Sequence, residues 1–244
     1  MTTHPGATPP RSTPPPAERT LVARYTPRLL LDRHEPFRPL AVGYTLFHAD
    51  GYSPSFPRIV GLTPVATPPA AFAIEYAIWW DWDIQHLYEL EHFWTYVDAS
   101  GAVVRAEGSW HGDFWAIARA EGEPPHLHNG THPIAYAQPG KHALTSSTDP
   151  LLIMKDHTRQ QCSANGKKGG VWLTPVSRPM IADRKSPHAD RLVNEYLQSR
   201  AFEPAFVWDT PFDISPDLLC PWPTLADWIP QRVDYLLAQL NGES

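Results

Sequence analysis

The sequence predicts a mainly β protein, a β-sandwich with flanking C-terminal helices (α+β class). In residues 72–80 every second side chain is large and apolar, which is the period of a strand. Residues 91–110 have the pattern of a β-hairpin, and the last third of the chain carries helical apolar stripes. The 28 prolines are spread along the chain and favour short elements joined by rigid turns.

The strands are expected in the first 150 residues. In the run 71–81 the large side chains share the face that we expect to line the core; they are Phe72, Ile74, Tyr76, Ile78 and Trp80. "DASG" at 98–101 has turn chemistry between strands at 91–97 and 102–110. Two apolar runs split by "EPFRP" at 35–39 predict short strands at a sheet edge or in a loop, and 132–140 predicts another strand ended by Pro-Gly.

Two helices are expected in the C-terminal third. Residues 187–200 follow Ser186 as N-cap, with Pro187 at the first helical position. Residues 224–241 carry an apolar stripe, with Pro230 as the expected kink and Gly242 near the end.

The chain is predicted to hold one domain, residues 20–244, after a disordered proline-rich leader at 1–19. The leader lacks the apolar segment of a secretory signal peptide, so we expect a cytoplasmic protein. A net charge of −6, with no basic cluster beyond Lys167 and Lys168, argues against nucleic acid as a partner. No apolar run approaches the ~20 residues of a membrane span. Cys162 and Cys220 are expected to be free thiols, although one bridge is conceivable.

Metal-ligand side chains crowd the segment "DWDIQHLYELEH" at 81–92, directly after the predicted core strand. Glu89 and Glu91 share a face in an extended chain, and His86 precedes them across a turn. His92 is expected on the opposite face, in a structural role. Oxygen and imidazole ligands suit Mg²⁺, Ca²⁺, Mn²⁺ or Zn²⁺. On spacing alone, a solvated, charged loop is the more ordinary interpretation of this segment.

The region "YAIWWDWDIQHLYELEHFWTYVD" resembles the signature of the necrosis- and ethylene-inducing cytolysins and their bacterial and vacuolar-sorting-protein relatives. There a hydrophobic strand precedes Gly-His-Arg-His-Asp-Trp-Glu; here the heptapeptide is "QHLYELE", 85–91. "EGSWHG" (107–112), "HPIAYAQPGKHA" (132–143) and "EPFRPLAVGY" (35–44) are similar to further family segments, in the same order.

The resemblance implies a β-sandwich flanked by helices, with a divalent cation held by Asp83, His86, Glu89 and Glu91. Glu89 stands where the family has aspartate, and Leu90 where it has tryptophan. Tyr88 replaces the family's second histidine, a residue linked to toxicity, so we do not expect a toxin.

His111 and His142 follow predicted strands whose ends can converge on the same rim of a sandwich. Each could be a further ligand, a general acid or base, or an orienter of water, or could simply cap a turn. With Tyr88 they are the predicted catalytic residues. His126, His128 and His132 are expected to face solvent.

These observations favour a metal-dependent enzyme, of hydrolase or lyase type, that acts on a glycan or glycoconjugate. The alternative is a non-catalytic, metal-dependent protein that binds sugars or lipid headgroups, and a purely structural metal is a third possibility. The sequence leaves the oligomeric state open.

Overall fold

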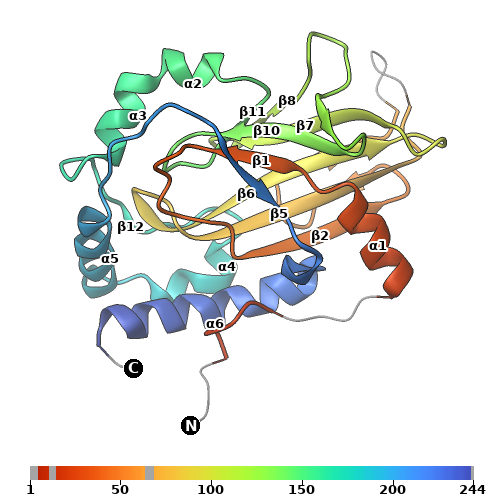
Figure 1. The fold of residues 1–244 in the computed structure, drawn as a ribbon. Coiled ribbons are helices and arrows are strands. Elements are labelled where there is room, and N and C mark those ends of the chain that lie inside the picture. The colour runs from red at the N-terminus through yellow and green to blue at the C-terminus, as the bar shows by residue number, and fades with distance from the viewer. Residues whose placement is uncertain (1–4, 11–14, 64–68, 243–244) are drawn as a thin grey trace.

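A computed structural model describes residues 5–10, 15–63 and 69–242, and its strands form two large sheets with helices around them (Figure 1). One sheet has five strands, in the order β11-β10-β1-β13 with β9 beside β10. The other has seven, in the order β14-β2-β5-β6-β7-β8 with β12 beside β6. The architecture is the predicted α+β sandwich.

The element bounds follow from the backbone geometry. The strands are β1 (Arg28–Leu31), β2 (Ala41–Phe47), β3 (Gly51–Tyr52), β4 (Ile59–Val60), β5 (Phe72–Trp82), β6 (His86–Val97), β7 (Val103–Trp110), β8 (Asp113–Ala116), β9 (Leu127–His128), β10 (His132–Ala137), β11 (Leu144–Thr145), β12 (Gly170–Val171), β13 (Thr210–Asp213) and β14 (Leu219–Pro221). The α-helices are α1 (Pro16–Arg24), α2 (Asp149–Ile153), α3 (Lys155–Cys162), α4 (Arg178–Ile181), α5 (Pro187–Ser199) and α6 (Trp222–Leu240).

The β5–β6–β7 meander is the centre of the larger sheet and carries the site. β5 and β6 pair antiparallel from Phe72 opposite Val97 to Trp82 opposite Leu87. The turn at 98–101 forms as predicted, because an Asp98 carboxylate oxygen accepts hydrogen bonds from the backbone of Ser100 and Ala102. The connection between β5 and β6 is short, residues 83–85, so the metal-ligand segment straddles a tight hairpin.

Strand β5 is buried on both faces, whereas the alternation of its side chains predicts only one buried face. One face joins the core between the two sheets, with Leu29 and Ala135 from the smaller sheet. On the other face α6 packs against β2, and a second apolar cluster forms around Trp94 and Tyr96 (Figure 1). Strands β1 and β2 both have neighbours on each side, so the prediction that they lie at an edge or in a loop is wrong.

The two predicted helices correspond to α5 and α6. The Ser186 side chain accepts a hydrogen bond from the Ala189 backbone and caps α5, with Pro187 in the first turn. Helix α6 contains Pro230 in its interior and continues to Leu240. No described helix has both the length and the apolar character needed to cross a membrane.

The prediction of a disordered leader at 1–19 is wrong for its described parts. Helix α1 begins at Pro16, and the backbone oxygens of Gly6 and Thr8 accept hydrogen bonds from Arg232 and Trp228 of α6. Residues 1–4 and 11–14 lie outside the described part of the chain. The single domain at 20–244 stays a prediction.

Candidate functional site: an acidic cluster at the β5–β6 hairpin

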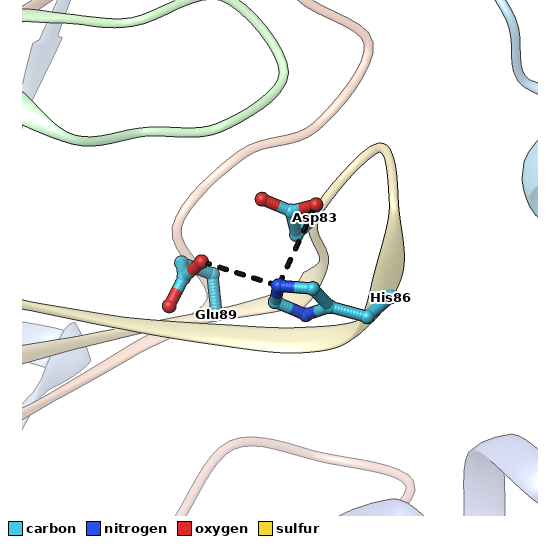
Figure 2. Close-up of side chains that lie close together, drawn as sticks. All are labelled: Asp83, His86 and Glu89. Carbon is cyan, nitrogen blue, oxygen red and sulfur yellow. Dashed lines mark ion pairs between the residues drawn. The ribbon is translucent and has the colours of Figure 1, made fainter. Parts of the chain in front are cut away.

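The turn of the β5–β6 hairpin brings Asp83, His86 and Glu89 together (Figure 2). The backbone N–H of Asp83 donates to the carbonyl of His86 at 3.0 Å, which closes the turn. An Asp83 side-chain oxygen, Oδ1, accepts the backbone N–H of Gln85 at 2.6 Å. The aspartate therefore shapes the turn and also presents its carboxylate to the two residues that follow.

One ligand atom of each of these three side chains lies within 4.8 Å of the other two. Nε2 of His86 is 3.7 Å from Oδ1 of Asp83 and 3.8 Å from Oε2 of Glu89. Ligands around a cation at about 2.0–2.5 Å stand about 3–5 Å apart, so these separations fit one shared ion.

The tautomer of His86 also fits a cation. Its Nδ1 lies 2.9 Å from the carbonyl oxygen of Tyr88, which can only accept a hydrogen bond, so Nδ1 carries the proton. Burial lowers the pKa of His86 to about 4, which keeps the imidazole neutral. Nε2 therefore points its lone pair between the two carboxylates, as a metal ligand does.

Glu91, the fourth predicted ligand, lies beside this group but outside the three whose ligand atoms converge. It is buried and accepts a hydrogen bond from the Ser109 hydroxyl. Burial raises the pKa of Glu91 to about 8. The pKa of Glu89 is raised as well, by burial and then by repulsion from Glu91 and Asp83. Both shifts mean that, without a cation beside them, these two carboxyl groups favour their protonated, neutral forms.

The structure also places a positively charged side chain, Lys141, against this cluster. Its Nζ lies 2.6 Å from Oδ2 of Asp83, and its side chain is 8% exposed. When Asp83, Glu89 and Glu91 are all ionised, they and the ammonium leave a net charge of −2 (three negative, one positive) around a neutral imidazole, which a divalent ion would balance. The donor types, the separations and this charge all fit Mg²⁺, Ca²⁺, Mn²⁺ or Zn²⁺.

The cluster opens into a cavity of about 530 Å³, large enough for a small-molecule ligand. The cavity follows the edge of β6 between β7 and β12. Its walls include Ser55, Phe56, His86, Tyr88, Glu89, Glu91, His92, Ser109, His111, Lys141, Lys167 and Trp172. The Trp172 ring stacks on the His86 ring, with centroids 5.7 Å apart, and is half exposed.

His111 is the predicted catalytic residue that the structure leaves accessible. It follows β7, is exposed and lines the cavity. Its Nε2 lies 2.8 Å from Oε1 of Gln138, whose amide nitrogen donates to Oγ1 of Thr158 at 3.0 Å. An amide oxygen only accepts, so Nε2 carries the proton and Nδ1 is free to accept one. Partial burial of the ring lowers the pKa of His111.

Tyr88, also predicted as catalytic, is buried in the cavity wall. Its ring stacks on Trp79 with centroids 5.0 Å apart and planes 3° apart. Burial raises the pKa of its hydroxyl to about 12. The hydroxyl is therefore protonated near neutral pH and is a poor base.

His142 does not line the cavity. It is fully buried, stacks on Trp80 at 4.7 Å, and places Nε2 3.3 Å from an Oε atom of Glu35. The other Glu35 oxygen accepts the Gly140 backbone N–H at 2.6 Å. Glu35 and His142 thus anchor the loop that carries Lys141. This contact pattern is that of a structural residue, whereas the sequence predicts a catalytic one.

The remaining sequence candidates lie outside the converging group. His92 and its strand neighbour Glu91 lie on opposite faces of β6, as predicted, and His92 stacks on Trp94 in the cavity wall. Cys162 and Cys220 are buried and free. His126 is exposed, but His128 and His132 are half-buried, and Nδ1 of His132 lies 2.9 Å from the Thr26 carbonyl oxygen, so the expectation that all three face solvent fails for the last two.

Sequence reasoning missed Lys141, Gln138 and Glu35. Lys141 and Gln138 lie in "AQPGKHA", where only the histidine stands out as a candidate. The signal for Lys141 was a lysine flanked by a glycine and a histidine at a strand end near an acidic cluster. Glu35 offered no signal, because its partner Gly140 is 105 positions away.

Comparison with known proteins places the chain near one set of solved structures. No protein-family model matches it, and no curated protein matches it. The similar structures are of NLPPya. NLPPya is a necrosis- and ethylene-inducing-like protein, the family that the sequence motifs resemble.

The NLPPya complex with glucosamine has 17% identity and a TM-score of 0.38 over 80% of this chain and 96% of that one. A mutant of NLPPya has 19% identity and a TM-score of 0.37 over 80% and 96%. The NLPPya complex with mannosamine has 17% identity and a TM-score of 0.37 over 82% and 98%.

Proposed function

We propose that the protein is a divalent-cation-dependent enzyme, of hydrolase or lyase type, that acts on a glycan or glycoconjugate. The observation that carries this proposal is the convergence of Asp83, His86 and Glu89 on one wall of a cavity that also exposes His111. Separations within 4.8 Å, an Nε2 lone pair and a negative cluster suit a divalent ion.

The cation would be held by Asp83, His86 and Glu89, with Glu91 beside them. Bound there, a divalent ion polarises a hydroxyl, carboxyl or phosphoryl oxygen of the ligand. The residues of the chain orient that ligand and exclude water around it. Because Asp83 and Glu91 are buried and His86 is nearly so, a cation held among them would act on a ligand with little solvent screening.

His111 is the residue proposed to move a proton. Gln138 holds the Nε2 proton, so Nδ1 accepts a proton from a ligand hydroxyl or from water. A lowered pKa keeps the His111 imidazole neutral at physiological pH and ready to act as a base. The Tyr88 hydroxyl is buried and its pKa is raised to about 12, so it neither faces the ligand nor readily gives up its proton.

A glycan fits the shape and chemistry of this cavity. Hydroxyl pairs on a sugar are ligands for hard cations, and the apolar faces of sugar rings pack on aromatic side chains. Trp172 and Phe56 supply such rings on the cavity wall. Trp172 is half exposed beside His86, so a ring can reach it and the cation together.

A specific observation favours the second candidate, a non-catalytic cation-dependent binding protein. Tyr88 and His142 are buried in stacked contacts with tryptophan, so only one of the three predicted catalytic side chains is accessible. A single histidine beside a cation is enough to bind and orient a sugar without breaking a bond.

The first experiment is elemental analysis of the purified protein after dialysis without chelator. We expect about one equivalent of divalent metal in the wild type and much less in Asp83→Asn and Glu89→Gln. Glu123→Gln is the matched control, because Glu123 is an exposed carboxylate paired with Arg119. An equal metal content in all four proteins, or none in any, would refute the cation site.

The second experiment decides between the two candidate functions. Metal-loaded wild type and His111→Ala are incubated with a panel of glycans and glycoconjugates, and both binding and product are measured. Product formed by the wild type and abolished by chelator supports the enzyme. Chelator-sensitive binding without product, unaffected by His111→Ala, supports the binding protein.

A further inference from the structure

Lys141 is held rigidly against the acidic cluster by the loop between β10 and β11. The backbone N–H groups of Lys141 and His142 both donate to the Gln138 carbonyl, at 3.2 and 2.8 Å. Gly140 has φ = 68°, and a Cβ there would approach Ile84 to 2.9 Å, so the loop packs tightly on the hairpin. The position of the ammonium group is therefore fixed by the backbone as well as by its ion pair.

The two oxygens of Asp83 have different neighbours. Oδ2 contacts the Lys141 ammonium at 2.6 Å, while Oδ1 accepts the Gln85 N–H and lies 3.7 Å from Nε2 of His86. Only Oδ1 is thus turned toward the other ligand atoms. With Lys141 in place, Asp83 offers one oxygen to a cation, and the second stays with the ammonium.

Lys141 also changes the total charge of the cluster. Asp83, Glu89 and Glu91 would carry three negative charges, and these carboxylates are the groups that act on the Lys141 ammonium. The ammonium reduces that total to two. A divalent ion then neutralises the site, whereas a trivalent ion leaves an excess positive charge in a buried setting.

We propose that Lys141 is a built-in cation that sets the charge of the ion accepted at this site, favouring divalent over trivalent ions. This inference rests on the proposed cation site and names the residue that determines its selectivity. Lys141 acts as a positioning and charge-setting group, not as a ligand.

A purely structural ion pair is the competing role for Lys141, and the surroundings argue against it. A structural pair needs one carboxylate, but Lys141 has Glu89 and Glu91 as well as Asp83 among its charged neighbours. Lys167 lines the same cavity from an exposed position, and its carbonyl oxygen rather than its ammonium makes the hydrogen bond to Gln85. Lys167 is therefore a matched lysine without this role.

The charge-setting role and the purely structural role predict different ratios of divalent to trivalent ion affinity. Coulomb repulsion between Lys141 and a bound ion is proportional to the charge of the ion, so removing the ammonium favours a trivalent ion more than a divalent one. If Lys141 serves only to order the neighbouring side chains, by contrast, its removal weakens the binding of both ions to a similar extent. The ratio of the dissociation constants of Mn²⁺ and Tb³⁺ isolates the charge effect, and we expect it to rise roughly tenfold or more.

The test measures Mn²⁺ and Tb³⁺ binding by calorimetry in wild type, Lys141→Met, Lys141→Gln and Lys167→Met. Lys141→Gln removes the charge but keeps a donor for Oδ2 of Asp83, so it also serves if Lys141→Met folds poorly. We expect the Mn²⁺-to-Tb³⁺ ratio of dissociation constants to rise in both Lys141 variants and to stay at the wild-type value in Lys167→Met.

Two results would overturn the inference, and they are distinguishable. Wild-type binding with an unchanged ratio in Lys141→Met and Lys141→Gln would overturn the charge-setting role alone. Failure of wild type to bind either ion would overturn this inference and the proposed cation site together.

Discussion

Nε2 of His111 lies 2.8 Å from Oε1 of Gln138, and this contact decides which nitrogen of His111 can act in the cavity. Gln138 is itself fixed, because it is fully buried and its amide nitrogen donates to Thr158. The exposed histidine is therefore oriented by a buried amide, much as a catalytic base is oriented by a third group.

Replacing His111 by alanine should reduce turnover of an active substrate by about 10²–10⁴-fold, because the positioned base is lost. Metal content should stay at the wild-type value, since His111 is not among the converging ligand atoms. Steady-state kinetics and elemental analysis on the same preparation measure both. His126→Ala is the control, as His126 is exposed and outside the cavity lining. Loss of metal along with turnover would show instead that His111 holds the site together.

The local elements were predictable because their signals lie within a few residues of one another. The alternation of Phe72, Ile74 and Tyr76 predicted β5, and Ser186 followed by Pro187 predicted the start of α5. The convergence of Asp83, His86 and Glu89 was also within reach, since one hairpin carries all three. Helix α1 was missed because proline content was taken as disorder, although Pro16 is compatible with a first helical turn.

The contacts that assign roles within the site could not be predicted from the sequence. His142 is buried against Trp80 and contacts Glu35, 107 positions earlier, and only the packed sandwich brings these residues together. Lys141 and Asp83 likewise come from loops of different sheets. Sequence patterns report which face a residue lies on, whereas these roles depend on which strand ends meet after folding.

Acidity should change the stability of the metal-free protein through Glu91. Burial raises its pKa to about 8, against about 4.3 in an unfolded chain, so the folded state retains a proton that the unfolded chain releases. The free energy of unfolding therefore falls as pH rises toward 8, by at most about 1.4 kcal/mol per pH unit for this group. Between about pH 4 and 6.5, His86 makes the free energy of unfolding rise with pH, because its pKa is lowered to about 4 in the folded state and the unfolded chain binds the proton more readily. The decline should be clearest from about pH 6.5 to 8.

Urea unfolding of metal-free protein at several pH values between about 6.5 and 8 measures this slope. Glu91→Gln should reduce it, while Glu89, whose pKa is also raised, keeps part of it. Added Mn²⁺ or Ca²⁺ should stabilise the wild type more at about pH 8 than at about pH 6.5, because a cation competes with the proton for the carboxylates. A stability that rises over this range would contradict the assigned shift.

Replacing His142 by alanine should lower the free energy of unfolding by about 2–4 kcal/mol. The change opens space beside Trp80 and leaves a Glu35 oxygen without the histidine in a buried setting. Urea unfolding measures the loss, and His126→Ala again gives the baseline for an exposed histidine. At temperatures where the variant stays folded, turnover should be close to that of wild type. Loss of turnover with unchanged stability would support the catalytic role predicted from the sequence.

Backbone strain marks all three residues that the sequence predicts as catalytic. Tyr88, His111 and His142 have φ values of 59°, 49° and 65°, in the left-handed region that side chains other than glycine rarely adopt. A left-handed residue costs about 1–2 kcal/mol, and glycine avoids that cost while losing about 0.5–1 kcal/mol of chain entropy on folding. His111→Gly should therefore be more stable than His111→Ala by about 0.5–1 kcal/mol. Urea unfolding of the two variants without metal measures the difference. At His126, whose φ is not positive, the order should reverse. A His111→Ala variant as stable as His111→Gly would mean that the backbone at this position relaxes without strain.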